Sequence, residues 1–374
     1  MSRLENTGHF PIRRKRLIVT GVVQGVGFRP FVYSLALRHA LSGHVGNDSR
    51  GVFIEVEGPE WALQAFRENL VAEAPPLSHI EQVNEEILQP NGDDQFIIVH
   101  SESRNEGKTL LSPDVCVFAD CLEETLDPAD RRYRYPFTNC TNCGPRFTII
   151  QDIPYDRSNT SMAMFPMCAD CQEEYENPLD RRYHAQPNAC PVCGPQVWLE
   201  TAGAEGVVTA ERDAALVAAQ NLLAEGKVVA VKGLGGFHLA CDASSDAALT
   251  LLRERKGRVD KPFAVMARDL DTVRRFAALS DDEAALLTSR ERPIVLLKER
   301  PDSPLSHLVA PGNRLVGVML PYTPLHHLLL DSSLFRIAVL VMTSGNLSDE
   351  PIIKADDLAR RQLGRLADAF LFHN

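Results

Sequence analysis

The 374-residue sequence has no long apolar run. The longest apolar segment of note, residues 337–342, is only six residues long, whereas a helix needs roughly 20 apolar residues to cross a bilayer. A secretory segment is also missing, because the short apolar run 17–23 soon meets Gln24 and Arg29. The sequence therefore predicts a soluble protein without membrane association, and the missing export signal favours the cytoplasm.

Positive charge is also in short supply. The chain has 39 lysines and arginines against 50 acidic residues, for a net charge of −11. Residues 113–200 contain seven arginines, fourteen acidic side chains and no lysine. Binding to nucleic acid backbones depends on excess positive charge, so a nucleic-acid partner is not expected.

The shares of hydrophobic and charged residues are typical of globular domains. Hydrophobic residues make up 44% of the chain and charged residues 24%, enough to build two or three hydrophobic cores. Polar, acidic or glycine-containing stretches at 89–94, 101–108 and 201–206 mark boundaries. We expect a multidomain α/β protein with domains at 12–101, 109–199 and 207–374.

Eight of the nine cysteines lie in or beside a repeat with a period of fifty residues, in which 121–143 recurs as 171–193. The second copy has the spacing C-x2-C-x18-C-x2-C, which suits one tetrahedral zinc ion. Its four predicted ligands are Cys168, Cys171, Cys190 and Cys193. Ligation by four cysteines leaves no open position on the metal, so a structural zinc is expected.

The first copy departs from this pattern, because Phe118 stands where the repeat predicts its first cysteine. Cys116 is the nearest substitute, and a site of three cysteines is the alternative. The remaining predicted ligands are Cys121, Cys140 and Cys143. Two structural zinc ions are therefore expected, although the sequence leaves open whether each is bound within one copy or across both. Cys241 lies outside the repeat in an apolar run and is expected to be structural.

The first domain alternates strand and helix patterns. The expected strands are 16–23, 42–45, 52–57, 80–87 and 95–100, and the expected helices are 30–40 and 59–71. This order is that of a ferredoxin-like fold.

A glycine-rich segment, GVVQGVGFRP at residues 21–30, joins the first strand to the first helix. Glycines let backbone N–H groups approach an anion, and Arg29 can bind two of its oxygens at once. An ordinary glycine-rich turn with a solvated arginine is the alternative. The segment lacks Gly-Lys-Ser/Thr, which excludes a Walker loop.

The segment VQGVGFR, followed by Gly46, Asn47 and GVFIEV at 51–56, closely resembles the acylphosphatase signature. The resemblance implies that Arg29 binds the phosphoryl group and that Asn47 orients the attacking water. It also implies a mixed carboxyl-phosphate anhydride as substrate and a reaction that needs no metal.

The third domain has an α/β pattern. We expect a helix at 210–225, a strand at 227–231, a loop at 232–236 and then a helix through Leu252, with further strands at 263–266, 294–297, 316–320 and 337–342. Lys256 and Arg258 precede Lys261, and Pro262 favours extended backbone at Lys261. In an extended stretch, the side chains of Lys256 and Arg258 lie on the same face. Such cations suit a triphosphate, with a solvated basic helix end as the alternative.

Four further segments carry a resemblance of their own: GLGGFHLACDA, LRERKGRVDKPFAVM, APGNRLVGVMLPYTPLHHLLL and VMTSGNLSDEP. They resemble the YrdC-like domain of the HypF family of hydrogenase maturation carbamoyltransferases. The order of acylphosphatase, paired zinc modules and YrdC-like domain also matches that family's N-terminal part. The family continues into a C-terminal carbamoyl-transfer domain that this sequence lacks.

The resemblance implies an enzyme that hydrolyses carbamoyl phosphate to carbamate and then uses ATP, with Mg²⁺, to form carbamoyl-adenylate. The carbamoyl group would pass to the terminal cysteine of a HypE-like acceptor during synthesis of the cyanide ligands of [NiFe] hydrogenase. The expected nucleotide contacts are Lys232, Lys256, Arg258, Lys261, Thr343, Ser344 and Asn346. For His184, His326 and His327 we expect a structural or solvent-facing role. The alternatives are a threonylcarbamoyl-adenylate synthase and a non-enzymatic zinc-finger adaptor.

Overall fold

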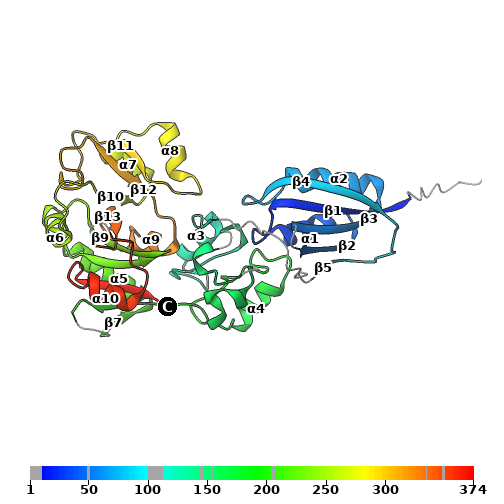
Figure 1. The fold of residues 1–374 in the computed structure, drawn as a ribbon, viewed down its shortest axis with the longest axis horizontal. Helices are drawn as coiled ribbons and strands as arrows, with labels where there is room; N and C mark the ends of the chain where they lie inside the picture. Colours follow the sequence, from blue (N-terminus) through cyan, green and yellow to red (C-terminus); the bar gives the residue numbers. More distant parts are fainter. Residues whose placement is uncertain are drawn as a thin grey trace, which may run out of the picture. The chain divides into compact units, whose positions relative to one another are not determined.

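The computed structural model describes residues 11–48, 51–99, 113–143, 146–152, 155–203, 207–333, 335–347 and 350–374 (Figure 1). The chain divides into two compact units, one drawn from Met1–Asp114 and Asn139–Asn188 and the other from Val115–Thr138 and Ala189–Asn374. The expected boundaries at 101–108 and, in part, 201–206 lie outside the described residues, so the three-domain division stays a prediction. No helix in the described ranges combines the length and apolar character of a membrane span.

The first unit contains a five-stranded sheet with the order β4-β1-β3-β2-β5. Its elements are β1 (Ile12–Val22), α1 (Phe28–Arg38), β2 (Ser42–Asp48), β3 (Gly51–Pro59), α2 (Glu60–Ala72), β4 (His79–Leu88) and β5 (Phe96–Ile98). β1 pairs antiparallel with β3 and β4, β2 pairs antiparallel with β3, and β5 adds to the edge in parallel with β2. The predicted ferredoxin-like order is confirmed.

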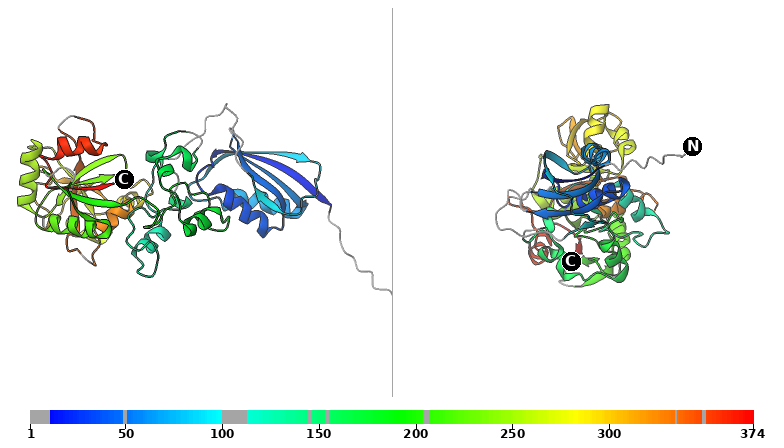
Figure 2. Two further views of the ribbon diagram at one scale, coloured as in Figure 1. Left: turned by 90° about the horizontal axis from the view of Figure 1, so that it is seen from below. Right: turned by 90° about the vertical axis from the view of Figure 1, so that its right-hand side faces the viewer.

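Alternating burial explains how this sheet acquires its core. Leu17 and Val19 on β1 are at most 1% exposed, and residues two apart on a strand point to the same face. Val32, Leu35 and Ala36 form the buried stripe of α1, at the spacing expected of an amphipathic helix. Both helices lie on one side of the sheet (Figure 2).

The two copies of the cysteine repeat fold alike. α3 (Ala119–Leu126) and α4 (Ala169–Glu176) occupy equivalent positions fifty residues apart. Arg134 and His184, also equivalent, both adopt left-handed backbone, with φ of 56° and 50°. Four short 3-10 helices complete this region: η1 (Thr141–Cys143), η2 (Phe147–Ile149), η3 (Arg157–Asn159) and η4 (Ser161–Met164).

A buried arginine of each copy is hydrogen-bonded to the backbone of the other. Arg132 Nε donates to the carbonyl oxygen of Ala189 at 2.9 Å, and Arg182 Nε donates to that of Asn139 at 3.1 Å. The arginines are 1% and 3% exposed. Each acceptor directly precedes the first cysteine of the Cys-x-x-Cys pair that ends its copy, Cys140 or Cys190, so each arginine helps to position a cysteine of the other copy.

The second unit contains a nine-stranded mixed sheet with the order β11-β12-β10-β13-β9-β8-β14-β6-β7. Its strands are β6 (Val197–Thr201), β7 (Val208–Glu211), β8 (Val229–Gly233), β9 (Gly236–Asp242), β10 (Ala264–Ala267), β11 (Val295–Lys298), β12 (Leu315–Met319), β13 (Val339–Ser344) and β14 (Ala369–His373). β10 runs parallel to β12 and β8 to β14, while the other pairs are antiparallel.

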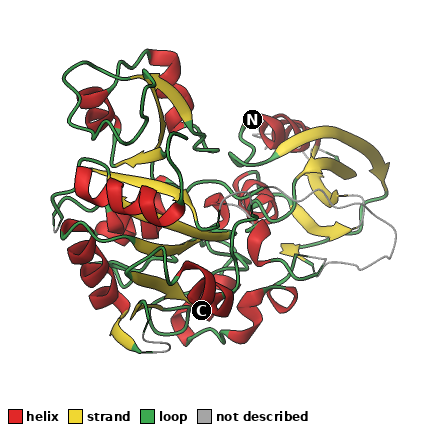
Figure 3. Cartoon of the chain, turned by 60° about the vertical axis from the view of Figure 1, so that its left-hand side comes forward, coloured by secondary structure: helices red, strands yellow, loops and turns green. Residues whose placement is uncertain are grey.

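Helices cover both faces of this sheet (Figure 3). They are α5 (Arg212–Ala224), α6 (Asp246–Lys256), α7 (Leu270–Phe276), α8 (Asp281–Thr288), α9 (Pro324–Leu329) and α10 (Asp356–Leu363). Leu252 of α6 and Phe276 of α7 contribute to the core on one face, whereas Leu216 of α5 and Leu328 of α9 contribute to the core on the other.

Several expectations for this region were wrong in detail. The loop expected at 232–236 is reduced to Leu234 and Gly235, between β8 and β9, and no helix follows it directly. Helix α6 begins only at Asp246, capped by the Ser245 side chain. Phe237 and Leu239 point into one core while Ala240 points into the other, which is the alternation of a strand buried on both faces. The helix expected from residue 210 begins at Arg212, because Val208–Glu211 pairs with β6.

Candidate active sites

In the first unit, the glycine-rich segment forms a tight turn between β1 and α1. Gly25 and Gly27 have φ of 73° and 75°, a left-handed conformation that costs little only for glycine. Gly27 caps α1 and has no side chain that could bond to the N–H groups of the first turn. The helix N-terminus therefore offers backbone donors to an anion.

The side chain of Gln24 connects this turn to the strand pair that carries Asn47. Gln24 Nε2 donates to the carbonyl oxygens of Asp48 and Gly51, each at 3.0 Å. Asn47 is 8% exposed, and its Oδ1 is buried without a hydrogen-bond partner in the described part of the chain. A buried amide oxygen of this kind is suited to accept a hydrogen bond from a bound water or substrate.

Arg29 lies in the first turn of α1, beside the free N–H groups. Burial lowers the pKa of Arg29, while the neighbouring Tyr183, Asp156 and Tyr175 act in the opposite direction. These neighbours belong to the 139–188 segment of the same unit. A guanidinium withdrawn from water gains strongly from an anionic ligand, so the site is suited to a phosphoryl group.

The cysteines group within their own repeat copies. The Sγ atoms of Cys168, Cys171, Cys190 and Cys193 lie within 4.8 Å of one another, as do those of Cys121, Cys140 and Cys143. The Sγ atoms of Cys140 and Cys143 are 4.0 Å apart, and those of Cys190 and Cys193 are 3.8 Å apart. Both distances are close to the ~3.8 Å between two sulfurs of a tetrahedral zinc–thiolate site. The donor type and spacing fit zinc.

Cys116 is not a member of the first group in the described chain, so that copy matches the three-cysteine alternative. Its backbone N–H donates to the carbonyl oxygen of Arg290 at 2.9 Å. Cys241 is completely buried, and burial, reinforced by Asp242, raises the pKa of its thiol to about 12. Such a thiol is unreactive at neutral pH, in agreement with a structural role.

In the second unit, cations from the end of α6 meet the end of β13. Lys256 Nζ donates to the carbonyl oxygens of Ser344 and Asn346 at 2.5 and 3.0 Å and to Asn346 Oδ1 at 3.0 Å. Arg258 Nη1 donates to Thr343 Oγ1 at 3.2 Å. Five of the seven predicted nucleotide contacts are thus brought together.

Lys256 does not lie in an extended stretch, as the sequence had suggested. It is the last residue of α6, and Gly257 ends the helix with φ of 62°. Burial, with repulsion from Arg258 and Lys261, lowers the pKa of Lys256 to about 8. An anionic ligand would offset both effects by favouring the charged form.

The other two predicted contacts are placed differently. Lys261 is exposed, and its described interactions include its carbonyl oxygen accepting from Arg258 Nε at 3.1 Å. Lys232 Nζ lies 2.7 Å from Asp356 Oδ1 and 2.8 Å from the carbonyl oxygen of His373. These contacts give Lys232 a structural partner between β8, α10 and the end of β14.

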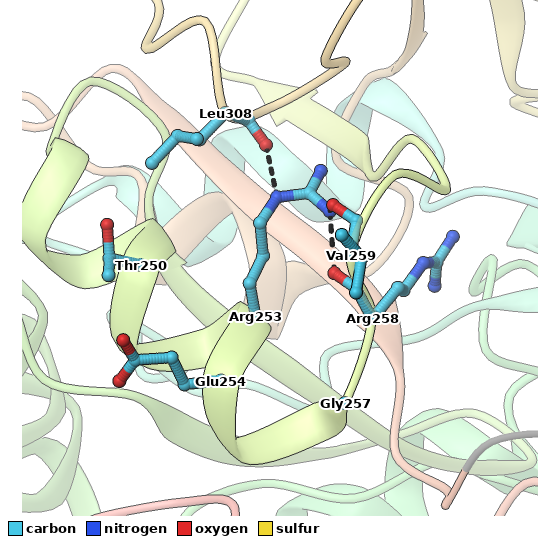
Figure 4. Close-up of a pocket in the computed structure, with 7 residues that line it drawn as sticks. All are labelled: Thr250, Arg253, Glu254, Gly257, Arg258, Val259 and Leu308. Carbon is cyan, nitrogen blue, oxygen red and sulfur yellow. Dashed lines mark hydrogen bonds between the residues drawn. The ribbon is translucent and has the colours of Figure 1, made fainter.

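Arg253, which the sequence prediction did not single out as a site residue, organises the loop after α6. Figure 4 shows its guanidinium beside the pocket at the end of the helix, donating to the carbonyl oxygens of Leu308 and Arg258, each at 2.8 Å. The pocket is lined by Thr250, Arg253, Glu254, Gly257, Arg258, Val259 and Leu308. In the sequence, an arginine that binds the carbonyl oxygens of a loop cannot be distinguished from an arginine that binds a ligand. Only the folded loop shows that Arg253 has the first role.

Three family models match successive parts of the chain. The model described as "Acylphosphatase" matches residues 15–98, the "HypF finger" matches 119–150 and 167–200, and the model described as "Telomere recombination" matches 221–374.

Several proteins are similar along almost the whole chain. Carbamoyltransferase HypF2 of Cupriavidus necator is 50% identical over 376 residues, covering 96% of this chain and 46% of that protein. The crystal structure of full-length HypF in the phosphate- and nucleotide-bound form superposes with a TM-score of 0.89 at 46% identity, covering 97% of this chain and 47% of the other. The structure of T. kodakarensis HypF gives a TM-score of 0.86 at 45% identity, covering 96% and 46%.

Proposed function

The chain belongs to the HypF family of carbamoyltransferases, and from this premise we propose that it converts carbamoyl phosphate to carbamate and then to carbamoyl-adenylate. It spans about half the length of the curated relatives it matches, 46% of the Cupriavidus necator protein. The observation that carries the proposal is the presence, in one chain, of a phosphate turn bearing Arg29 and of the cation cluster of Lys256 and Arg258 at the end of β13.

The first step takes place at the turn before α1. The N–H groups of the helix N-terminus and Arg29 bind the phosphoryl oxygens and stabilise the charge that develops on them. Asn47 Oδ1 accepts a hydrogen bond from water and aims it at phosphorus. The new oxygen–phosphorus bond forms as the bond to the carbamoyl oxygen breaks, which yields phosphate and carbamate.

The second step takes place at the end of β13. A carbamate oxygen attacks the α-phosphorus of ATP, and the bond to the β-phosphoryl oxygen breaks to release pyrophosphate. Lys256, Arg258 and the polar groups of Thr343, Ser344 and Asn346 bind the nucleotide and its phosphates. Lys261 adds positive charge nearby, and Mg²⁺ is held mainly by the phosphate oxygens.

The cysteine groups support this chemistry structurally. Two zinc ions would be held by the four cysteines of the second copy and by Cys121, Cys140 and Cys143 of the first, with Cys116 as the further candidate ligand. Thiolate ligands require reduced cysteines, which favours the cytoplasm. The carbamoyl group then passes from the adenylate to a cysteine thiol of a HypE-like acceptor protein, which loses its proton as AMP leaves.

Pyrophosphate release from Mg-ATP tests the two steps together. The unaltered chain should release pyrophosphate only when carbamoyl phosphate is supplied, and Arg29→Ala should abolish that release. Ammonium carbamate, which bypasses the first step, should restore release in the Arg29→Ala chain but not in a Lys256→Ala chain. Release that is independent of both carbamoyl compounds would contradict the proposal.

A threonylcarbamoyl-adenylate synthase is the other enzymatic candidate, because threonylcarbamoyl-AMP synthase of Mus musculus is 36% identical over 137 residues. Pyrophosphate release that requires threonine and bicarbonate and ignores carbamoyl phosphate would favour that activity. A non-enzymatic adaptor would show neither dependence.

A further inference from the structure

A group of aromatic and imidazole side chains lies on the α9 face of the second unit's sheet, at the end of β13 that the cation cluster reaches from the α6 face. His326 of α9 is 0% exposed, and its ring centroid lies 4.4 Å from that of Tyr322 and 6.3 Å from that of His238 on β9. From its sequence context, His326 was expected to have only a structural or solvent-facing role, and neither reaction step uses these histidines.

The strand register brings this group close to the predicted nucleotide contacts. His238 is the direct antiparallel partner of Ser344, so their side chains lie on the same face of the sheet. Ala240 and Met342, which share that face, belong to the same core as α9. The Ser344 carbonyl oxygen accepts from Lys256, so the cations, which come from α6 on the other face of the sheet, reach the strand end that pairs with His238.

Two imidazole nitrogens in this group have no partner. Nε2 of His326 and Nδ1 of His238 are buried and make no hydrogen bond to any residue that the structure describes. An unpaired buried polar atom is costly, so a partner outside the protein is expected.

The contacts of Thr323 allow His326 Nε2 to act as a hydrogen-bond donor. The Thr323 hydroxyl oxygen already accepts the backbone N–H of His326, and it lies 2.9 Å from His326 Nδ1. If the hydroxyl donates to Nδ1, the hydrogen of the neutral ring resides on Nε2, which becomes a donor. Burial lowers the pKa of both His326 and His238, which favours the neutral rings.

Glycine at position 233 keeps the second unpaired nitrogen uncrowded. A Cβ atom placed on Gly233 would lie 3.1 Å from His238 Nδ1, so any larger residue there would crowd this atom. A donor and an acceptor nitrogen, both neutral and shielded from water, suit a small planar molecule that has a carboxylate and an amino group.

We propose that His238 and His326 bind the carbamate beside the nucleotide, with His326 Nε2–H donating to a carbamate oxygen and His238 Nδ1 accepting from the amino group. The histidines orient the carbamate and transfer no proton, because attack by the carboxylate oxygen on phosphorus releases none. This inference rests on the proposed function and assigns the second substrate of the adenylation step.

The test measures initial rates of pyrophosphate release from Mg-ATP with ammonium carbamate as the varied substrate, so that the acylphosphatase site is not required. His238→Ala and His326→Ala should each raise the KM for carbamate about 10- to 100-fold, as expected for the loss of a buried hydrogen bond, and leave the KM for ATP within about twofold. His238→Asn and His326→Gln, whose amides replace the hydrogen-bonding atoms, should recover most of the affinity.

His327→Ala is the matched control. His327 also lies on α9 and is half-buried, but it makes no ring contact with His238 in the described chain. It should therefore leave the KM for carbamate unchanged. Gly233→Ala keeps both imidazoles and crowds His238 Nδ1, so it should raise that KM even where His326→Ala does not fold.

Three results would overturn the inference. An unchanged KM for carbamate in the alanine variants would mean that the nitrogens bind only water. Equal increases in both KM values, or losses that the conservative variants do not recover, would assign the histidines a structural role. If the unaltered chain released no pyrophosphate with carbamate, the proposed function itself would fail first, which separates the two failures.

Discussion

Lys256 Nζ donates to Asn346 Oδ1 at 3.0 Å, which connects the last residue of α6 to a residue just beyond β13. The two positions are ninety residues apart in sequence. The bond fixes the cation at the strand end, where a nucleotide phosphate would find it already oriented.

ATP binding should depend on the protonation of Lys256. Because burial and nearby cations lower the pKa of Lys256 to about 8, the lysine is charged below that pH and loses its proton above it. The dissociation constant for Mg-ATP should therefore rise above pH 8, approaching about tenfold per pH unit. Isothermal titration calorimetry between pH 7 and 9.5 would measure it.

Two variants make this measurement specific. Lys256→Met should weaken binding and remove the inflection. Lys261→Gln removes a charge that helps to lower the pKa of Lys256, so it should move the inflection to higher pH. An inflection that survives in Lys256→Met would assign the titration to another group.

Acylphosphatase activity should depend on Arg29 and Asn47 in different ways. Arg29→Ala removes a cation that binds the phosphoryl group throughout the reaction, and kcat/KM for carbamoyl phosphate should fall about 10³-fold or more. Asn47→Ala removes the group that aims the water, so kcat should fall about 10²-fold with little change in KM. Arg38→Ala is the control, because Arg38 is half exposed at the far end of α1.

The glycine-rich turn between β1 and α1 should tolerate no side chain at Gly27. Gly27 and Gly92 both have φ of 75°, but a Cβ on Gly27 would lie 2.9 Å from Thr141 Oγ1, whereas nothing lies within 4 Å of one on Gly92. Gly92→Ala should cost about 1–2 kcal/mol in free energy of unfolding from backbone strain alone. Gly27→Ala should cost at least about 1 kcal/mol more and abolish phosphatase activity.

Urea unfolding followed by the fluorescence of Trp61, in a Trp198→Phe background, would isolate the first unit, because the chain has two tryptophans. Equal losses in the two glycine variants would show that the Thr141 contact is unimportant. Removing that contact in Gly27→Ala/Thr141→Ala should restore part of the stability but not the activity.

Zinc content should follow the cysteine groups. Elemental analysis should find two zinc ions per chain, with one lost in Cys190→Ser and one lost in Cys121→Ser. Cys116→Ser should keep both, because Cys116 lies outside the described three-cysteine group. Loss of a zinc ion in Cys116→Ser would instead support the sequence-based assignment of Cys116 as the fourth ligand.

The sequence predicted local features of this molecule better than distant ones. The ferredoxin-like order followed from the alternating patterns of the first domain, and five nucleotide candidates came together as expected. β9 was missed because the glycines at 233–236 suggested a loop, while the alternation from Phe237 to Cys241 was treated only as an apolar run. A strand buried on both faces lacks the polar side that makes such a pattern easy to recognise.

Other features depend on partners that the local sequence does not contain. The sequence predicted Lys232 as a nucleotide contact, but its Nζ lies 2.7 Å from Asp356 Oδ1 in the fold. Lys256 was expected in extended backbone and instead ends α6, yet it reaches Ser344 because β13 ends beside the helix. The pairing of His238 with Ser344 depends on strand register, which the sequence did not specify.

The exchanged arginine contacts of the cysteine repeat bear on how a duplicated segment evolves. Arg132 and Arg182 each hold the backbone before a cysteine of the opposite copy, so neither copy is a self-sufficient module. Deleting one copy would remove the arginine that holds the backbone of the remaining copy, which makes the duplication hard to reverse. The same hydrogen bonds hold the backbone independently of any single metal ligand, so they remain available to the first copy, which has Phe118 where the second has Cys168.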